Sequence, residues 1–317
     1  MKHVFIMNPS SGKKKKRIAF VENLKASAEA LGADYSLYYT KGAGDGQRYA
    51  KELCAEHDAR GEKLRLYGCG GDGTINELVN GAFGFENVEI GAIPLGTGND
   101  YVRNYGDVSD FLNITGQIRG ASVPSDLIRY RAEYEGHITE GYCANMFNIG
   151  FDCNVVDLTA RVKSLPFISG SLAYLISVGI ILIKKKGADL RIEYADGSVS
   201  DGKILLTAIA NGCYCGGGVK GVPYCSLDDG LMDVSVIKNV SRLFFVALFP
   251  SYAKGIHMEK KAIQKRDVIN YTKEKTLTVT ANGESLRLCT DGEITTQKRI
   301  EFSMVKDGFR FILPEGL

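Results

Sequence analysis

The chain has 317 residues, which is more than one compact hydrophobic core usually holds and enough for two domains. Lysine and arginine number 39 against 37 aspartates and glutamates, so the net charge of +2 creates no molecule-wide field that would favour nucleic acid. Tryptophan is absent and no basic run alternates with aromatic residues, which also argues against RNA binding. Any basic function must therefore be local.

Cysteine use indicates a reducing compartment. No two of the eight cysteines form a CxxC pair, which argues against both a zinc ribbon and a disulfide framework. The eight are Cys54, Cys69, Cys143, Cys153, Cys213, Cys215, Cys225 and Cys289. The N-terminal sequence MKHVFIMNPSSGKKKK places its apolar run before its basic run, the reverse of a signal peptide. We therefore expect a cytoplasmic protein.

One uncharged segment, residues 165–183, approaches the length of a membrane-spanning helix. Pro166, together with glycines and serines, dilutes its first half and leaves a strongly apolar stretch of about a dozen residues. A stretch of that length is more typical of a buried or lipid-facing helix than of a membrane span.

The first third of the chain alternates strand-like and helix-like segments. Strand patterns occur in HVFIMN, YSLYYT, KLRLYGC and VEIGAIPLGT, and helical patterns at residues 17–31, around 47–56 and from Thr74. Apolar strands separated by glycine turns and amphipathic helices predict βαβ units and a parallel sheet.

From about Ser125 the pattern changes to many short runs of alternating or β-branched residues. These runs are DLIRYRAEY, ANMFNIGFD, ADLRIEYA, ILLTAIANG, LMDVSVIK, KTLTVTA, SLRLCT and RIEFSMV. They predict an all-β domain with helical excursions. We place the boundary near residues 120–130, which gives an α/β domain at 1–127 and a β domain at 128–317.

Three glycine-rich segments follow predicted strands of the α/β half. They are residues 8–12 (NPSSG), 70–74 (GGDGT) and 94–100 (PLGTGND). In an open parallel sheet, ligands bind beyond the carboxyl ends of the strands, where glycine lets the backbone approach a phosphate and the next helix donates N–H groups. Each segment alone is equally well explained as a tight turn, but the three together indicate a nucleotide.

These loops alone do not identify the nucleotide. Residues 68–73 formally match GxGxxG, a dinucleotide pattern that follows the first strand of a βαβ unit and precedes an acidic residue at the end of the next strand. Here the loop follows the third strand, and Glu86 and Glu89 precede a strand. No GxxxxGK[ST] occurs, so the chain is not a P-loop kinase.

The sequences GGDGTINELVNG and PLGTGNDYVRNYG resemble the catalytic domain of the diacylglycerol kinase family, which includes sphingosine kinases and soluble bacterial lipid kinases. The resemblance extends over nearly the whole chain, because further motifs follow in the family's order. These are NIGFDCNVV, GSLAYL, ANGCYCGGGVKGVPYCSLDDGLMDVSVI and TDGE. A phosphate loop of the GGDGT type also occurs in NAD kinases.

This resemblance implies an ATP-dependent and magnesium-dependent kinase that phosphorylates a lipid alcohol such as diacylglycerol. The implied fold is an NAD kinase-like α/β domain followed by a C-terminal β-sandwich whose last strand can return to the first domain, with ATP and lipid meeting in the cleft between the domains. The implied ATP-site residues are Asn8, Pro9, Ser10, Ser11, Gly12, Thr40, Gly70, Gly71, Asp72, Gly73, Thr74, Ile75, Asn76 and Thr97.

Phosphoryl transfer requires alignment, neutralisation of phosphate charge and a base that receives the hydroxyl proton. Backbone N–H groups of residues 71–74 are suited to phosphate, and Asp72 can hold Mg²⁺ directly or through water. Asp72 is alternatively a cap of the helix that begins near Thr74, and the two roles are compatible.

The sequence TDGE, residues 290–293, resembles the family's DGE motif. The resemblance implies that Glu293 is the general base and that Asp291 is a further catalytic residue. From the residues alone, Asp-Gly between two strand patterns predicts a β-hairpin turn.

The sequence SLDDGL, residues 226–231, resembles a structural magnesium site of the bacterial lipid kinases. The resemblance implies ligands at Ser226, Asp229 and the main chain of Leu231. An Asp-Gly turn that leads into the strand LMDVSVI is the alternative, and the sequence leaves both open.

A kinase of bilayer lipids works at a membrane surface. Basic runs at residues 13–17 and 184–186 can contact anionic headgroups, and residues 172–183 can form an apolar wall beside the second run. We therefore expect peripheral contact with the inner membrane face, and a homodimer is left open. The alternatives are a kinase with a soluble acceptor of the NAD kinase type, a non-catalytic nucleotide sensor and a dinucleotide-binding module.

Overall fold

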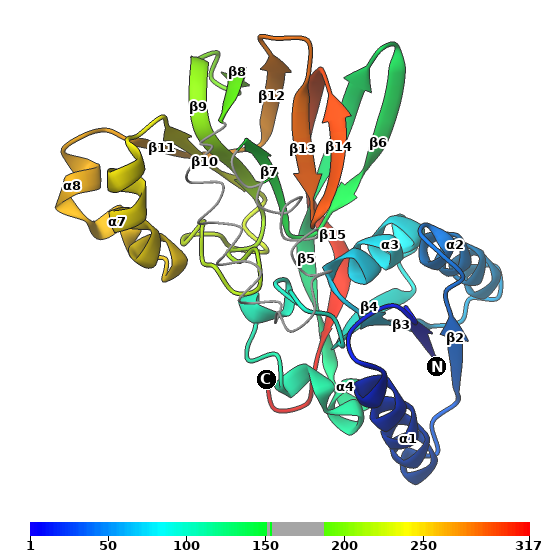
Figure 1. Cartoon of the computed structure of the whole chain (residues 1–317). Coiled ribbons are helices and arrows are strands. Elements are labelled where there is room, and N and C mark those ends of the chain that lie inside the picture. The colour runs from blue at the N-terminus through cyan, green and yellow to red at the C-terminus, as the bar shows by residue number, and fades with distance from the viewer. Residues whose placement is uncertain (151–152, 154–186) are drawn as a thin grey trace. The chain divides into compact units, whose positions relative to one another are not determined.

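A computed structural model describes residues 1–150, 153 and 187–317 of the chain, which form two compact units (Figure 1). Unit 1 consists of Met1–Leu127 and Lys306–Leu317, and unit 2 of Ile128–Val305. Two strands, β5 (Ala121–Tyr134) and β15 (Arg299–Leu313), contribute residues to both units.

Unit 1 is the α/β domain that the alternating pattern predicts. Its strands pair in parallel in the order β4-β3-β1-β2, and Phe311 of β15 adds a parallel pairing with Ile90 of β4. The elements in chain order are β1 (Lys2–Met7), α1 (Lys14–Leu31), β2 (Tyr35–Tyr39), α2 (Asp45–Asp58), β3 (Leu64–Gly70), α3 (Asp72–Ala82), β4 (Val88–Pro94), the 3-10 helices η1 (Val102–Asn104) and η2 (Asp110–Leu112), and α4 (Ile114–Arg119).

Helices cover both faces of this sheet. Phe5 of β1 and Tyr67 of β3 share a hydrophobic cluster with Leu24 of α1. On the other face, Gly68 of β3 leaves room for Ile75 of α3, whose backbone and side chain lie 3.6 Å from the position that a Cβ would occupy. Both faces of the parallel strands are therefore buried, which explains why β3 is a continuous buried run and does not alternate.

The strand order creates a topological switch point between β1 and β3. The chain leaves β1 toward β2 on one side and leaves β3 toward β4 on the other. The loops that follow these two neighbouring strands therefore diverge, and such a point is where open α/β sheets bind ligands. The loops concerned are the first two of the three glycine-rich segments.

Unit 2 is built from antiparallel strands that form a β-sandwich. Its strands pair in the order β14-β13-β7-β9-β8-β12-β15, while β10 lies between β9 and β11. The further elements are β6 (His137–Cys143), β7 (Met146–Gly150), β8 (Ala188–Tyr194), β9 (Val199–Ala210), β10 (Met232–Lys238), α7 (Arg242–Ala253), η3 (His257–Glu259), α8 (Lys261–Gln264), β11 (Ile269–Glu274), β12 (Thr276–Ala281), β13 (Leu286–Thr290) and β14 (Glu293–Gln297).

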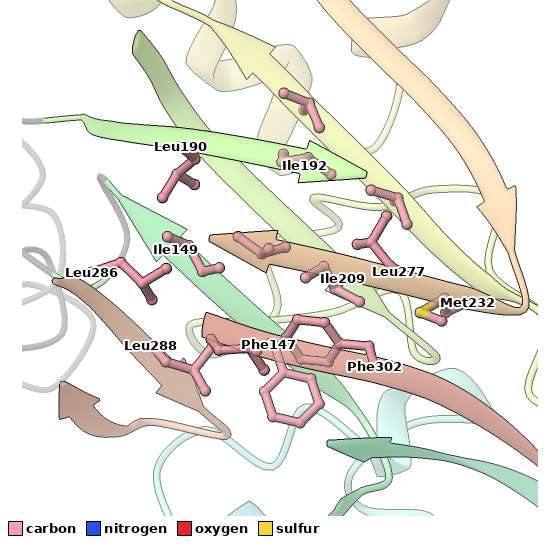
Figure 2. Close-up of a cluster of buried hydrophobic side chains, with 14 of the residues drawn as sticks. Phe147, Ile149, Leu190, Ile192, Ile209, Met232, Leu277, Leu286, Leu288 and Phe302 are labelled. Atoms are coloured by element: carbon pink, nitrogen blue, oxygen red, sulfur yellow. The ribbon is translucent and has the colours of Figure 1, made fainter. Parts of the chain in front are cut away.

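A large hydrophobic cluster lies between the strands of unit 2. Figure 2 shows Phe147 of β7, Ile209 of β9, Leu277 of β12 and Phe302 of β15 gathered in this cluster, and each is at most 2% exposed. Full burial of such a side chain contributes about 1.5–3 kcal/mol relative to exposure. The inward residues alternate with exposed polar ones, as β8 illustrates, so the predicted period-2 pattern is confirmed.

Two strands, β6 and β11, do not show the alternating pattern, and the structure gives a physical reason. Among the described strands, β6 pairs with β5 alone, and most of its residues are exposed, so it needs no apolar alternation. In the same set β11 pairs with β10 alone and is only partly buried. Edge strands carry a weaker pattern because fewer of their side chains enter a core.

All eight cysteines lie among the described residues and none forms a disulfide, which agrees with the reduced thiols that their spacing predicts. Within the described ranges, every helix falls short of the length and apolarity that crossing a bilayer requires. The apolar stretch at residues 165–183 and the basic run at 184–186 lie outside the described residues.

Candidate active site

The three glycine-rich loops lie together at the carboxyl edge of the unit 1 sheet. They follow β1, β3 and β4, which are neighbours in the sheet. The N–H of Asn8 donates to the carbonyl of Cys69 at 3.1 Å, and the N–H of Gly96 donates to the carbonyl of Gly70 at 2.9 Å. Segments far apart in the sequence are thus joined directly by main-chain hydrogen bonds.

Glycine is required where these loops touch. Gly12 has a φ of +64°, and a Cβ at this position would collide with the carbonyl oxygen of Leu95. A Cβ on Gly96 would lie 2.6 Å from the Cα of Gly71, closer than the 3.0 Å that real Cβ contacts respect. The close packing of the three backbones therefore depends on the absence of side chains.

The first loop, residues 8–12, is a turn held by its own polar atoms. The side-chain Oδ1 of Asn8 accepts the N–H of Ser10 at 2.9 Å, and its carbonyl accepts the N–H of Ser11 at 3.1 Å. Arg17 donates from Nη1 to the carbonyls of Ser11 and Gly12, both at 2.8 Å. One cation of the basic run 13–17 therefore holds the loop itself, whereas residues 13–16 are exposed.

The second loop leads into α3, which begins at Asp72, two residues before the start that the pattern predicts. In the first turn of a helix the N–H groups of Asp72 and Gly73 have no intrahelical acceptor, and the helix dipole makes this end positive. The N–H of Thr74 already donates to the carbonyl of Gly71 at 3.0 Å. The N–H groups suited to a phosphate are therefore those of residues 71–73, and Thr74 does not belong to the set.

Asp72 joins the second loop to the third. Its Oδ2 accepts the N–H of Asp100 and its Oδ1 the N–H of Tyr101, both at 3.0 Å. The helix-cap interpretation is wrong, because the N-cap position is occupied by Gly71 and Asp72 is the first residue of the helix. No ion pair involves Asp72 among the residues that the structure describes. Among the described residues, the hydrogen bonds that Asp72 accepts come from these two N–H groups, which leaves about two of its roughly four lone-pair positions for another ligand.

The other predicted ATP-site residues differ in how they are exposed. Thr97 is exposed, Thr40 is buried with its N–H donating to the carbonyl of Met7 at 2.9 Å, and Ile75 points into the core against Gly68. The side chain of Ile75 therefore cannot line a ligand site, and only its backbone belongs to the loop. Pro9 and Ser10 are exposed, Gly70 and Thr74 are buried, and Ser11, Gly71, Asp72, Gly73 and Asn76 are half-buried.

Two residues of this framework lie inside the quoted motifs but were not predicted as site residues. Glu77 of α3 accepts the N–H of Gly44 at 2.8 Å and that of Gly46 at 2.9 Å, so it ties α3 to the start of α2. Asn99 is buried with a φ of +53° and donates its amide to the carbonyl of Gly96 at 3.0 Å. Asparagine tolerates positive φ, so an asparagine within a glycine-rich loop is the sequence signal that could have indicated this backbone conformation.

In unit 2, the DGE segment forms the hairpin that the residues alone predict. Asp291 and Gly292 have φ values of +45° and +95°, and Thr290 pairs with Glu293 on either side of them. Positive φ at both central residues is the requirement of the tight turn that suits twisted strands. Glu293 is thereby placed at the first position of β14, where it is exposed.

Asp291 fastens this hairpin to the connection between β6 and β7. Its Oδ1 accepts the N–H of Met146 at 3.3 Å, and its Oδ2 accepts the thiol of Cys143 at 3.3 Å. Burial, and then the Asp291 charge, raises the pKa of Cys143 well above its usual value. Burial also raises the pKa of Tyr130, and Cys143 and the negative charge of Glu293 add to that shift. Glu293 thus lies near a half-buried phenol.

The SLDDGL segment holds a cation of the chain itself. Asp229 accepts the N–H of Leu231 at 3.0 Å through Oδ1, while its Oδ2 lies 2.7 Å from the Nζ of Lys273. The same ammonium lies 3.2 Å from Oδ2 of Asp233, whose side chain is fully buried. Ser226 instead donates its hydroxyl to Asp228 at 2.7 Å.

These contacts do not fit a divalent metal on Ser226, Asp229 and Leu231. The Lys273 ammonium already neutralises Asp229 on the oxygen that a metal would need, and the Ser226 hydroxyl is directed at another side chain. In the described part of the chain, no three His, Cys, Asp or Glu side chains converge as metal ligands would. We derive no step through a metal at this place.

The electrostatics of this cluster follow from burial. Burial raises the pKa of Asp233, even though Tyr271 donates to its Oδ1 at 2.7 Å and Lys273 lies beside it. Burial opposes the charge of Lys273, but its contacts with Asp229 and Asp233 raise its pKa. Both pKa values rise because desolvation dominates at the fully buried carboxyl, whereas the partly exposed ammonium keeps its hydration.

Solved structures share this arrangement of an α/β unit and a β-sandwich. The structure of a putative diacylglycerol kinase from Bacillus anthracis str. Sterne matches with a TM-score of 0.69 and 22% identity, covering 100% of this chain and 98% of that one. Yeast NADH kinase complexed with NADH matches with a TM-score of 0.50 and 11% identity, over 98% of this chain and 83% of that one. The fold therefore defines a class of two-domain proteins that includes diacylglycerol kinases and NADH kinase.

Sequence comparison identifies the family to which the chain belongs within this class. Residues 2–130 match the diacylglycerol kinase catalytic domain, and residues 145–307 match the YegS C-terminal NAD kinase beta sandwich-like domain. A diacylglycerol kinase of Bacillus subtilis (strain 168) is 30% identical over 316 residues, which cover 98% of this chain and 95% of that protein. The chain belongs to the diacylglycerol kinase family. It is a lipid kinase, and its kinase domain implies a nucleotide substrate.

Proposed function

We propose that the protein transfers the γ-phosphoryl group of ATP to the hydroxyl of diacylglycerol or a related lipid alcohol, with a product such as phosphatidic acid. The observation that carries the proposal is the meeting of three glycine-rich loops, without intervening side chains, at the switch point of the unit 1 sheet. Such an edge lets a polyphosphate lie close to main-chain N–H groups. The curated relative named above acts, by its name, on diacylglycerol.

In this proposal the first and second loops hold the phosphates of ATP. The loop at residues 8–12 is already ordered by Asn8 and Arg17, so little conformational entropy is lost when a nucleotide binds. The N–H groups at residues 71–73 would donate to phosphate oxygens at the positive end of α3. Thr40 and Thr97 would lie at the borders of the same site.

Asp72 is the residue suited to a magnesium ion. Its carboxylate is fixed by two main-chain donors and has lone pairs to offer, which matches the oxygen ligands that Mg²⁺ prefers. A bound Mg²⁺ would neutralise charge on the phosphate oxygens during transfer. Asp72 would hold it directly or through water.

Glu293 is the proposed base. Its carboxylate would take the proton of the lipid hydroxyl as that oxygen forms a bond to the γ-phosphorus, while the bond between the γ-phosphorus and the bridging oxygen breaks and ADP leaves. Asp291 would act as a positioning residue, because its contacts with residues 143 and 146 hold the hairpin from which Glu293 projects.

The acceptor is tested with γ-labelled ATP, Mg²⁺ and a panel of lipid alcohols in mixed micelles, beside soluble acceptors such as NAD. Label in the organic phase establishes lipid phosphorylation and names the acceptor. Label that stays in the aqueous phase on a soluble acceptor would overturn the proposal.

The base is tested with Glu293→Gln, for which we expect kcat to fall about 10²–10⁴-fold, the range that a general base contributes. ATP binding, measured by equilibrium dialysis, should persist because Glu293 lies outside the phosphate loops. Glu284→Gln, another exposed glutamate of unit 2, is the matched control and should keep its activity. A Glu293→Gln enzyme with a wild-type kcat would remove this residue from the mechanism.

A further inference from the structure

Residues 241–266 of unit 2, here called the α7 corner, concentrate positive charge. They comprise α7, η3, α8 and the turns between them. The sequence SRLFFVALFPSYAKGIHMEKKAIQKR contains six lysines and arginines against one glutamate, a net charge of +5 with His257 neutral. Because the whole chain carries only +2, the rest of it is negative overall. The near-neutral total conceals this local field.

α7 also has an apolar face that the protein leaves open to solvent. Leu243 is 84% exposed and Val246 is 51% exposed, and the exposed Ala247 and Pro250 continue the same face at helical spacing. The opposite face, represented by Phe245, is buried in a second hydrophobic cluster of unit 2. A surface helix normally turns polar residues outward, so an apolar residue at each of these four positions indicates a binding surface.

A groove extends this face toward the turns that follow α7. It has a volume of about 470 Å³ and is lined by residues that include Phe244, Ala247, Pro250, Lys254, Ile256 and Lys260. Ile256 is 39% exposed, and the guanidinium of Arg266 lies 4.9 Å from the centre of the Phe244 ring. The groove is therefore lined by both apolar and cationic side chains.

The cations beside the apolar face are available to an external partner. Lys254, Lys260, Lys261, Lys265 and Arg266 are all exposed. Within the described residues, none of the five forms an ion pair. Unpaired cations next to uncovered apolar side chains match the two layers of a membrane surface, which are anionic headgroups and the start of the acyl chains.

We propose that the α7 corner docks on a bilayer that carries anionic lipid. Leu243 and Val246 enter the boundary between headgroups and acyl chains, while the lysines of α8 and the turn before it contact headgroup phosphates. The inference deepens the proposed function and rests on it, because a lipid acceptor is delivered in a membrane. Pairing of two copies through this corner would bring +5 against +5, which opposes a symmetric dimer.

The test is co-sedimentation of the full chain with sucrose-loaded vesicles of phosphatidylcholine, with and without phosphatidylglycerol, in the absence of ATP and acceptor. We expect binding only to the vesicles that contain phosphatidylglycerol. Leu243→Asp/Val246→Asp and Lys260→Glu/Lys261→Glu/Lys265→Glu should each reduce the partition coefficient about tenfold or more. The first variant removes apolar area that enters the bilayer, and the second removes cations that attract the anionic surface.

Matched controls change the same chemistry elsewhere. Ile138→Asp/Val199→Asp alters two other exposed apolar side chains of unit 2, and Lys51→Glu/Lys203→Glu/Lys306→Glu makes the same change in net charge at exposed lysines. Both controls should bind vesicles more tightly than the corresponding α7-corner variants. Equal binding by control and corner variants would overturn the proposal, as would equal binding of the wild type to neutral and anionic vesicles.

Two further measurements separate the possible failures. The α7-corner variants should keep the wild-type rate on a water-soluble short-chain acceptor and lose rate only on vesicles. If no acceptor is phosphorylated but the vesicle binding follows the expected pattern, the proposed function fails and the docking surface stands. If light scattering shows a wild-type dimer that Leu243→Asp/Val246→Asp dissociates while vesicle binding is unchanged, the corner joins two copies and the membrane proposal is wrong.

Discussion

Asp72 in unit 1 and Asp229 in unit 2 both lie beside glycine in a loop, and both were predicted as metal ligands. The groups that contact the two carboxylates nevertheless differ. Asp72 is held by the main-chain N–H groups of Asp100 and Tyr101. Asp229 accepts one main-chain N–H and is neutralised by Lys273 at 2.7 Å. N–H dipoles orient a carboxylate and leave its charge in place, whereas an ammonium supplies the charge that a metal would bring.

This difference teaches that an acidic motif alone does not define a metal site. Among the described residues, Asp72 itself forms no ion pair, since the nearby Arg103 pairs with Asp100, and such a carboxylate suits a divalent ion that arrives with a nucleotide. The loop around Asp229 has an internal ion cluster that includes the buried Asp233. The first arrangement depends on an external cation, and the second does not.

The largest effect is expected for Asp72→Asn. The amide keeps the size of the side chain but removes its charge, so kcat with ATP and Mg²⁺ should fall about 100-fold or more, the scale of lost electrostatic stabilisation in an active site. The Mg²⁺ concentration for half-maximal rate should rise in steady-state assays. Asp110→Asn is the control, because Asp110 also accepts a main-chain N–H, that of Asp107 at 2.9 Å. An unchanged kcat and Mg²⁺ dependence would mean that Asp72 only holds the second and third loops together.

Lys273→Met should affect stability and metal response. It leaves Asp229 facing the buried Asp233, and we expect a loss of about 1–3 kcal/mol of unfolding free energy, between the values for exposed and buried ion pairs. Thermal unfolding should be the same for the wild type in Mg²⁺ and in chelator, while the variant should gain stability with Mg²⁺.

The control for this experiment is Lys238→Met, which removes the exposed pair with Asp267 at 2.6 Å. Its cost should be about 0–1 kcal/mol, with no response to Mg²⁺. A wild-type protein that melts at lower temperature in chelator would contradict the interpretation that Lys273 takes the place of a metal.

The smallest effect concerns the pH dependence of stability at Asp233. Burial raises its folded pKa above the unfolded value of 3.8. Between these two pKa values the folded state holds more protons than the unfolded state, so the contribution of Asp233 is most favourable below 3.8 and is lost as pH rises through the folded pKa. The unfolding free energy of Asp233→Asn minus that of the wild type should therefore increase with pH in urea titrations.

Asp267→Asn provides the reference slope for that measurement, because Asp267 is exposed and pairs only with Lys238 among the described contacts. If the difference for Asp233→Asn falls with pH, the Lys273 charge outweighs burial at this carboxyl. That outcome would mean that the contact with Lys273, and not desolvation, dominates the pKa of Asp233.

Local patterns predicted much of the fold because burial imposes them. The parallel sheet, the three loops after its strands and the Asp291-Gly292 hairpin were all predicted from period, apolar runs and turn residues. Helix starts were predicted late, since the lysines at residues 14–16 carry no apolar period although they favour helix. α7 carries no helical period because it is apolar on both faces. The roles of the ATP-site residues and of Glu293 stay predictions.

The sequence by itself determined the order of the elements and which loops needed glycine, because strand and helix periods and positive φ values are properties of short segments. Only the tertiary structure decided which charges meet. The contacts of Asp72 with residues 100 and 101, of Glu77 with residues 44 and 46, and of Lys273 with Asp229 join residues that are 28 to 44 positions apart. No periodicity connects residues so far apart in the sequence. Whether a carboxylate meets an ammonium or an N–H group, or keeps a lone pair for an external ligand, therefore depends on how the strands and helices pack.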